Sequence, residues 1–333
     1  MDAKQANGGI RPNSSNLEKD SAILYAGGDR PSWVDYIPTK WRPYIQLSRL
    51  NFAAPVLLVY LPHFYGVMHT AIVHRHDYRI QDVVYVCILL LGGSFFYSNA
   101  AHAWDDIVDV PLDRKMERTK NRPIARGAIT TKAAFVFTVA QALMAASFLL
   151  LLPPAAAMSA VPSVLTATYY PYAKRHTYLP QVVLGFCLAW GVVTGSASLG
   201  LKQPWDSRPR MCLVLACTIW TVIYDTIYAH IDVPEDLRLG LKSTAVLFRH
   251  HLKSFLWSLL GCMAVLLHCC GVLSDLGLLY FIIAEGSSIV YIGLMIYRVE
   301  LNSETSCYRW FSMGFWVPGF AIAFGLIGEY LLG

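Results

Sequence analysis

Acidic residues that could hold a divalent metal gather at two places in the chain. They are Asp105, Asp106, Asp109 and Asp113 in the first cluster, and Asp225, Asp232, Glu235 and Asp236 in the second. In the first cluster, a helix would project positions 105, 109 and 113 from one face, because they are four residues apart. In the second cluster, the same spacing puts positions 232 and 236 on one face, and position 225 joins that face because it lies seven residues before 232. Mg²⁺ prefers oxygen ligands and commonly shares them with substrate phosphates. The two clusters together predict a magnesium cage, whereas either one alone is equally typical of a solvated helix end.

Basic residues follow each acidic cluster closely. Those after the first are Arg114, Lys115, Arg118, Lys120, Arg122 and Arg126, and those after the second are Arg238 and Lys242. Carboxylates, a divalent metal and Arg or Lys together form a diphosphate site, because the metal bridges phosphate and carboxylate oxygens while the cations neutralise the remaining charge. The alternative for part of this set is a basic run that marks the cytosolic side of a membrane protein or faces anionic lipid.

The elements that must position these side chains are long apolar segments. The chain has 333 residues, of which 55% are hydrophobic and only 15% charged, and its mean hydropathy is +0.43. Soluble domains carry roughly 25% charged residues. Nine windows are long and apolar enough to span a bilayer, at 53–73, 83–104, 133–152, 155–173, 181–201, 211–230, 251–273, 276–297 and 311–332. We therefore predict an all-α integral membrane protein with about nine transmembrane helices.

The basic residues are distributed unevenly between the loops that join these windows. On one side of the membrane lie 22 of the 27 Lys and Arg residues, and the exceptions are Arg75, Arg79, Lys202, Arg208 and Arg210. Cytosolic loops carry such an excess, so the N-terminus and both acidic clusters are predicted to face the cytosol. Topology thus explains the net charge of +5, and nucleic-acid binding is not expected. A diphosphate site at a lipid bilayer points to an isoprenyl diphosphate, whose tail can lie between apolar helices.

The first 40 residues differ from the rest in being polar and rich in Gly, Ser, Asn and Asp. We predict a disordered tail over 1–40 and a transmembrane domain over 41–333. The tail lacks the Arg-rich, acid-poor composition of a mitochondrial presequence and the apolar core of a signal peptide. We therefore expect insertion into the endoplasmic reticulum or another endomembrane, rather than the mitochondrial inner membrane. The eight Cys residues lie almost entirely in apolar windows without metal-ligand spacing and are interpreted as packing residues.

Three segments resemble the UbiA-type intramembrane prenyltransferases, in the branch of the 4-hydroxybenzoate polyprenyltransferases. The segment DDIVDVPLDRKMERTKNRPIARG (105–127) is similar to the family's NDxxDxxxD motif and its trailing RT..NRP stretch. The segments YPYAKRHTYLPQ (170–181) and YDTIYAHIDVPEDLRLGLKSTA (224–245) resemble YPxxKRxTxLPQ and YDTxYAxxDxxxD…GxKSTA. The resemblance covers the chain from about residue 40 to its end. It implies a bundle of helices around a central cavity and a Mg²⁺-dependent prenyl transfer.

The resemblance also implies roles for individual residues. The metal ligands would be Asp109, Asp113, Asp232 and Asp236, with Asp105 standing where the family usually has Asn. The diphosphate would be bound by Lys174 and Lys242, and less strongly by Arg118 and Arg122. Arg175 matches the position associated with the carboxylate of an aromatic acid acceptor. The stretch from Arg49 corresponds to the family's basic-Asp-Lys-Pro stretch, which would make Arg49 part of the acceptor pocket, but Leu50, Asn51 and Phe52 depart from that pattern.

The reaction implied is ionisation of the allylic C–O bond, followed by attack of an electron-rich ring on the carbocation. A weak base then removes the ring proton, and both Asp225 and the diphosphate are candidates. His102 and His230 are interpreted as structural residues. We expect farnesyl transfer to a phenolic acid of the orsellinate type in meroterpenoid biosynthesis. The alternatives are the 4-hydroxybenzoate polyprenyltransferase of ubiquinone biosynthesis, a terpene cyclase on the same scaffold, and a transporter. Acids at helix ends disfavour transport, and Lys174 with Arg175 disfavours the cyclase.

Overall fold

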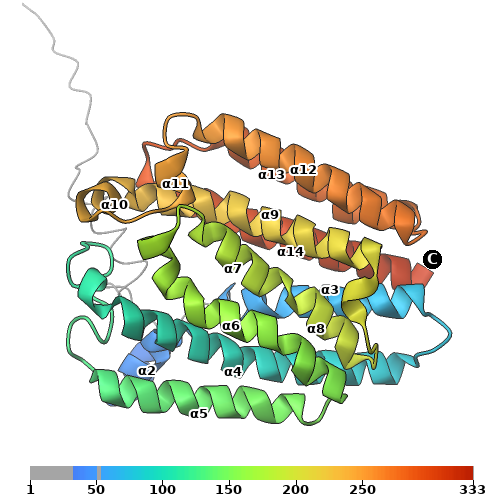
Figure 1. The fold of residues 1–333 in the computed structure, drawn as a ribbon, viewed down its shortest axis with the longest axis horizontal. Coiled ribbons are helices and arrows are strands. Elements are labelled where there is room, and N and C mark those ends of the chain that lie inside the picture. Colours follow the sequence, from blue (N-terminus) through green and yellow to red (C-terminus); the bar gives the residue numbers. More distant parts are fainter. Residues whose placement is uncertain (1–32, 51–53, 333) are drawn as a thin grey trace, which may run out of the picture.

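The computed structural model describes residues 33–50 and 54–332. In these ranges the regular elements are helices, and nine long helical segments form one bundle (Figure 1). The segments are α3 Ala54–Val73, α4 Ile80–Asp113, α5 Thr131–Leu149, α6 Pro154–His176, α7 Pro180–Ala189 with α8 Gly191–Ser198, α9 Arg208–Ala229, α12 Leu252–Leu273, the π-helix η4 Tyr280–Gly286 with α13 Ser287–Arg298, and α14 Glu304–Leu332. Each of the nine predicted windows corresponds to one segment, so the prediction of an all-helical membrane protein is confirmed.

Eight of these segments are long and apolar enough to cross a membrane. The remaining one is α6, whose 23 residues are rich in Ala, Ser, Pro and Thr and end in Lys174, Arg175 and His176. It is long enough for a span but less apolar, because Pro, Ser, Thr and Ala take up most of its length in place of larger apolar side chains. The hairpin between α5 and α6 turns at Pro153, and Pro154 occupies the first turn of α6, where a missing N–H costs nothing.

Short elements cap one end of the bundle. They are α2 Arg42–Leu47, η3 His230–Asp232, α10 Val233–Leu239 and α11 Thr244–Leu247, and with the segment 114–130 they lie at the left in Figure 1. Another short helix, η2 Pro204–Asp206, belongs to the connection between α8 and α9. The predicted disordered tail lies mostly outside the described residues, but Trp33–Tyr36 within it forms the 3₁₀ helix η1. Both acidic clusters are therefore next to a single capped end.

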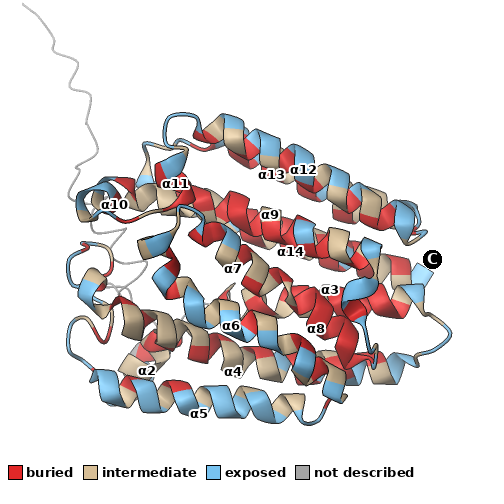
Figure 2. Cartoon of the chain, viewed as in Figure 1, coloured by how far each residue is buried: buried red, intermediate tan, exposed pale blue. Residues whose placement is uncertain are grey.

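Burial separates the helices into central and peripheral ones. Figure 2 shows α8 and α9 mostly buried, whereas α5 exposes most of its length. The exposed side chains of the peripheral helices are apolar, as with Val136 and Leu143 on α5 and Val265 on α12. In a membrane these faces contact lipid rather than water, so they carry no cost. In the core, Trp220 Nε1 donates a hydrogen bond to the Gly314 carbonyl at 2.8 Å, which ties α9 to α14.

The helices α3 and α8 approach each other backbone to backbone at two glycines. A Cβ on Gly66 would lie 2.0 Å from the Val192 carbonyl oxygen, and one on Gly195 would lie 2.0 Å from the His63 carbonyl oxygen. Small residues at helix interfaces allow this close packing in membranes. The contact fixes α3 against the centre of the bundle, and the first turns of α3 then line the cavity described below.

Candidate active site

The first acidic cluster lies on the last three turns of α4. This helix continues through Pro111 to Asp113 as a single element of 34 residues, well past the end of the predicted apolar window. Asp106 and Asp109 are 2% exposed and Asp113 is 3% exposed. Carboxylates so deeply buried require positive partners, and the structure supplies them from three separate segments of the chain.

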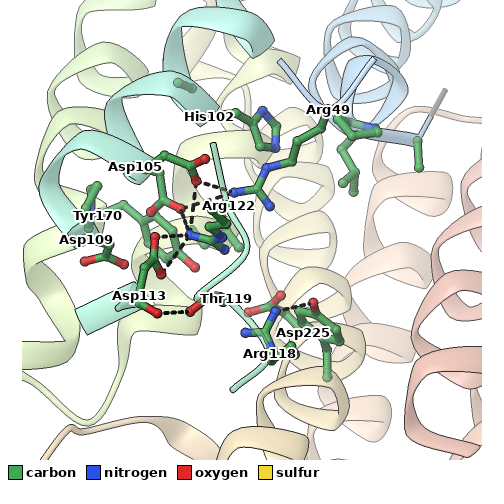
Figure 3. Close-up of a pocket in the computed structure, with 18 of the residues that line it drawn as sticks. Arg49, His102, Asp105, Asp109, Asp113, Arg118, Thr119, Arg122, Tyr170 and Asp225 are labelled. Atoms are coloured by element: carbon green, nitrogen blue, oxygen red, sulfur yellow. Dashed lines mark hydrogen bonds and ion pairs between the residues drawn. The ribbon is translucent and has the colours of Figure 1, made fainter. Parts of the chain in front are cut away.

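Arg122 holds the first cluster from the segment that follows α4 (Figure 3). Its Nη1 atom lies 3.0 Å from Asp106 Oδ1, 3.1 Å from Asp113 Oδ2 and 3.7 Å from Asp105 Oδ2. Burial alone would lower the pKa of the Arg122 guanidinium, but the three carboxylates outweigh it and raise that pKa above its ordinary value. Arg122 is therefore a permanent cation at the centre of the cluster.

Positions 105, 109 and 113 lie on one continuous helix and all three line the cavity, but Asp106 also takes part in the cluster and the four carboxylates have different partners. Residues advance by about 100° each around an α-helix, so positions 106 and 113 differ by only about 20°, whereas 105 and 113 differ by about 80°. Accordingly, Asp106 and Asp113 share Arg122, while Asp109 faces α6. There it pairs with Lys174 and, through Oδ1, lies 3.2 Å from Arg175 Nη2.

Asp106 is a site residue that the sequence interpretation did not assign to a role. Besides Arg122, it accepts a hydrogen bond from Arg49 Nη2 at 2.9 Å, and the same Nη2 atom lies 3.6 Å from Asp105 Oδ2. Arg49 follows α2 and has a left-handed backbone conformation with φ 54°. The signal that could have identified Asp106 is its seven-residue spacing from Asp113, which places both on one helix face.

The second acidic cluster is built across a bend. The helix α9 ends at Ala229, the 3₁₀ helix η3 contains Asp232, and α10 carries Asp236. The predicted continuous face from Asp225 to Asp232 is therefore wrong in its geometry, because the 3₁₀ turn interrupts the helix between the two. Nevertheless Asp225, Asp232 and Asp236 all line the same cavity, and Glu235 does not.

Arg118 connects the two clusters. It donates from Nε to Asp232 Oδ1 at 2.8 Å and from Nη2 to Asp232 Oδ2 at 2.5 Å, and Nη1 donates to the Tyr228 hydroxyl at 2.9 Å. Arg118 comes from the segment after α4, whereas Asp232 comes after α9. This bidentate pair is a geometrically specific contact, and it fixes the two acidic helix ends relative to each other.

The loop after α10 is also tied to the site. Gly240, with φ 68°, ends α10 in the left-handed conformation that glycine favours. The Lys242 backbone N–H then donates to the Lys174 carbonyl at 2.9 Å, and Lys242 Nζ donates to the His176 carbonyl at 3.3 Å. Close by, the Gln181 amide hydrogen-bonds to Asp225 and accepts from the Thr244 backbone N–H at 3.0 Å. Thus Lys174 and Lys242, predicted separately, are brought together.

One cavity of about 1390 Å³ joins these groups. Its charged end is lined by Arg49, Asp105, Asp106, Asp109, Asp113, Arg118, Arg122, Lys174, Asp225, Asp232, Asp236 and Lys242. Further along the helices its lining becomes apolar and aromatic, with Leu58, Tyr97, Leu184, Leu188, Tyr224, Phe311, Phe315 and Trp316. Arg175 is not among the lining residues, since its guanidinium faces Asp109 and the Val108 and Pro171 carbonyls. Of the two predicted acceptor residues, Arg49 alone borders the cavity.

The donor set is suited to a hard divalent cation. Within residues 33–50 and 54–332, no three His, Cys, Asp or Glu side chains converge closely enough to hold a metal ion. Mg²⁺, however, keeps several waters and is usually bound through one or two carboxylates together with substrate phosphates. The charged end of the cavity offers carboxylate oxygens from both clusters, whereas Cys187, which also lines the cavity, directs its thiol to the Ser163 carbonyl. The residues present therefore fit Mg²⁺ that is bound along with a diphosphate.

Comparison with known proteins gives a consistent result along most of the chain. The model of the UbiA prenyltransferase family matches residues 79–318. The chain is 32% identical over 302 residues to Prenyltransferase stbC of Stachybotrys bisbyi, and the alignment covers 90% of this chain and 89% of stbC. It is 30% identical over 302 residues to the mitochondrial 4-hydroxybenzoate polyprenyltransferase of Schizosaccharomyces pombe, covering 91% of this chain and 83% of that protein.

Solved structures share the same fold. A UbiA homolog from Aeropyrum pernix K1, in its apo structure, matches with a TM-score of 0.70 at 22% identity, covering 84% of this chain and all of that one. A UbiA homolog from Archaeoglobus fulgidus bound to GPP and Mg²⁺ matches with a TM-score of 0.65 at 16% identity, covering 86% of this chain and 98% of that one. At these identities the likeness establishes the architecture of the helical bundle.

Proposed function

This chain belongs to the UbiA prenyltransferase family and is a membrane-embedded prenyltransferase, and on that premise we propose that it transfers a farnesyl group from its diphosphate to a phenolic acid of the orsellinate type. The observation that carries the proposal is the cavity at the two acidic clusters, which has carboxylates and cations at one end and an apolar, aromatic lining further in. A prenyl diphosphate has the same division into a charged head and an apolar tail.

The diphosphate is bound at the charged end of the cavity. Lys174, Lys242, Arg118 and Arg122 all border it, and guanidinium and ammonium groups are the usual partners of phosphate oxygens. Mg²⁺ would be held by Asp105, Asp109 and Asp113 on one side and by Asp232 and Asp236 on the other, and it would supply charge neutralisation for the leaving diphosphate. The A. fulgidus homolog, which has the same fold, was solved with GPP and Mg²⁺.

The ion pairs of the structure indicate how the chain accommodates this charge. In the structure, Lys174 neutralises Asp109, and Arg118 neutralises Asp232. A bound diphosphate offers both cations an alternative anionic partner, and the two carboxylates are then free to coordinate a metal. Each carboxylate and each cation would then have an opposite charge beside it, which matters because uncompensated charge is costly next to a hydrocarbon core.

The aromatic residues form one wall of the cavity beside the second cluster. Tyr228 stacks on Phe311 at a centroid distance of 4.4 Å, and Tyr224 lies 5.7 Å from Phe311. Aromatic faces attract cations, so this wall can stabilise the allylic carbocation and shield it from water until the acceptor ring attacks. The ring proton then passes to a weak base. The two candidates for this base are Asp225, which lines the cavity, and the departing diphosphate.

An acceptor that carries a carboxylate is proposed because Arg49 borders the cavity. Among the described residues, Arg49 pairs through Nη2 with Asp105 and Asp106, and its Nε and Nη1 atoms are the donors proposed for an aromatic carboxylate. Several of the fungal relatives are called prenyltransferases without a stated acceptor, such as stbC. Transfer to 4-hydroxybenzoate is the second candidate function, because the S. pombe relative bears that name. The endomembrane location with a cytosolic N-terminus stays a prediction.

The test is product analysis with membranes that contain the protein. They are incubated with farnesyl diphosphate, Mg²⁺ and either orsellinic acid or 4-hydroxybenzoate, with Asp109→Ala membranes as the matched control. We expect a C-prenylated orsellinate that the control does not form. Prenylation of 4-hydroxybenzoate alone would favour the second candidate. A cyclic hydrocarbon with diphosphate release and no prenylated phenol would instead make the chain a terpene cyclase.

A further inference from the structure

His102 has one ring nitrogen engaged and the other available at the cavity. It lies on α4, one turn before the first acidic cluster, and borders the cavity (Figure 3). Its Nδ1 atom is 2.7 Å from the Ser98 carbonyl oxygen. A carbonyl oxygen can only accept, so Nδ1 carries the hydrogen and donates it. In the neutral imidazole, Nε2 then has a free lone pair and acts as a hydrogen-bond acceptor.

The surroundings of His102 are those expected of an acceptor pocket. Among the residues that the structure describes, no hydrogen bond reaches Nε2. In Figure 3 the ring lies beside the Arg49 side chain, which pairs with Asp106 through Nη2. One turn further from the charged end, Tyr97 lines the cavity, and its hydroxyl donates to the Ser163 carbonyl at 3.2 Å. An imidazole acceptor and a guanidinium donor thus adjoin one wall of the cavity.

We propose that His102 Nε2 accepts a hydrogen bond from the phenolic hydroxyl of the aromatic acceptor and thereby selects free phenols over their alkyl ethers. The inference rests on the proposed function, since it needs an aromatic acceptor in this cavity. A phenol that donates a hydrogen bond gains electron density on its oxygen and on the ring carbons ortho and para to it. These are the carbons that attack the allylic carbocation, so the same contact both orients the ring and activates it.

The two nitrogens of His102 can be tested separately. In His102→Asn the short amide can replace Nδ1 in donating to the Ser98 carbonyl, but it cannot reach the position of Nε2. In His102→Gln the longer side chain places an amide oxygen near the position of Nε2 and provides the acceptor. A purely structural role for His102 predicts that Asn substitutes better than Gln. The proposed role predicts the reverse.

The experiment measures kcat/KM for a phenolic acid and for the corresponding methyl ether with purified protein, farnesyl diphosphate and Mg²⁺. A site that hydrogen-bonds a substrate hydroxyl discriminates against analogues that lack it, so the natural chain should prefer the phenol by at least about tenfold. His102→Gln should keep most of this ratio. His102→Asn should reduce it to within about threefold, with the KM for farnesyl diphosphate unchanged. His76→Asn, an exposed histidine in the loop between α3 and α4, is the matched control.

Several results would overturn the assignment. One is a phenol-to-ether ratio in His102→Asn equal to that of the natural chain. Another is an equal rise in the KM of donor and acceptor, which would place the effect at the diphosphate site. If the natural chain prenylates other acceptors but neither of this pair, only the inference about His102 fails. If it prenylates no aromatic compound while it ionises farnesyl diphosphate, the proposed function fails and this inference falls with it.

Discussion

Replacing Asp106 tests whether buried ion pairs hold the first acidic cluster in place. Its carboxylate is 2% exposed, accepts from Arg49 Nη2 at 2.9 Å and lies 3.0 Å from Arg122 Nη1. Hydrogen bonds to charged groups contribute about 1.5–3 kcal/mol each, and neutral ones are roughly half as strong. Asp106→Asn keeps an oxygen at this point without the charge, so it should lower the free energy of unfolding by about 2 kcal/mol. Asp106→Ala removes both of these charged contacts, although Arg122 keeps Asp113 and Arg49 keeps Asp105 as partners, and should lower it by about 3–5 kcal/mol.

The measurement is denaturant unfolding in detergent micelles, followed by tryptophan fluorescence. The matched control is Glu117→Ala, because the Glu117 side chain is 79% exposed and pairs with Lys120 at the surface. Exposed pairs contribute little, so this variant should unfold like the natural chain. A double-mutant cycle that combines Asp106→Ala with Arg49→Gln should give a coupling of about 1.5–3 kcal/mol. Equal stability of Asp106→Ala and Glu117→Ala, or a coupling near zero, would refute the reasoning.

Three further changes test other parts of the molecule. Arg118→Leu removes the bidentate contact with Asp232 and should raise the KM for farnesyl diphosphate by at least about tenfold; initial rates with an unchanged KM would exclude Arg118 from donor binding. Chelation of divalent cations with EDTA should abolish prenyl transfer and Mg²⁺ should restore it, so activity that persists in EDTA would contradict metal dependence. Gly195→Ala places a Cβ 2.0 Å from the His63 carbonyl oxygen and should unfold at a much lower temperature than Gly261→Ala, whose Cβ meets open space; similar melting temperatures would contradict the close packing of α3 and α8.

The fold was largely predictable because spanning helices leave a strong signal. A run of about 20 apolar residues has few alternatives in a bilayer, and every predicted window is helical. The ends of helices were less predictable where a helix continues beyond its apolar residues. The helix α4 continues to Asp113 because Arg122 and Lys174 neutralise its acidic last turns. A hydropathy window cannot predict this, because the two cations come from other segments of the chain.

The ion-pair and hydrogen-bond partners of the site residues were not predictable from the spacing of these residues in the sequence. The family resemblance implied that Arg175 meets an acceptor carboxylate, which stays a prediction; in the structure its guanidinium lies 3.2 Å from Asp109. Adjacent residues on a helix project about 100° apart, so Lys174 and Arg175 could not both face the cavity fully. His102 was interpreted as structural because a single histidine near an acidic cluster is ambiguous. Only the engagement of Nδ1 by Ser98, together with the cavity, distinguishes its second nitrogen.

Asp105, which stands where the family usually has Asn, differs from the other carboxylates of the first cluster in its contacts and its exposure. The short contacts with Arg49 and Arg122 belong to Asp106, whereas Asp105 lies 3.6 and 3.7 Å from the same two guanidinium groups. Its side chain is 21% exposed and borders the cavity, whereas the 3% exposed Asp109 is engaged by Lys174. A metal that binds Asp109 must first displace a cation, but Asp105 is reachable without such a displacement. Two nearby guanidinium groups therefore balance the negative charge that Asp105 adds. The side chain of Asp105 is also the carboxylate of this cluster that is most accessible to an incoming metal.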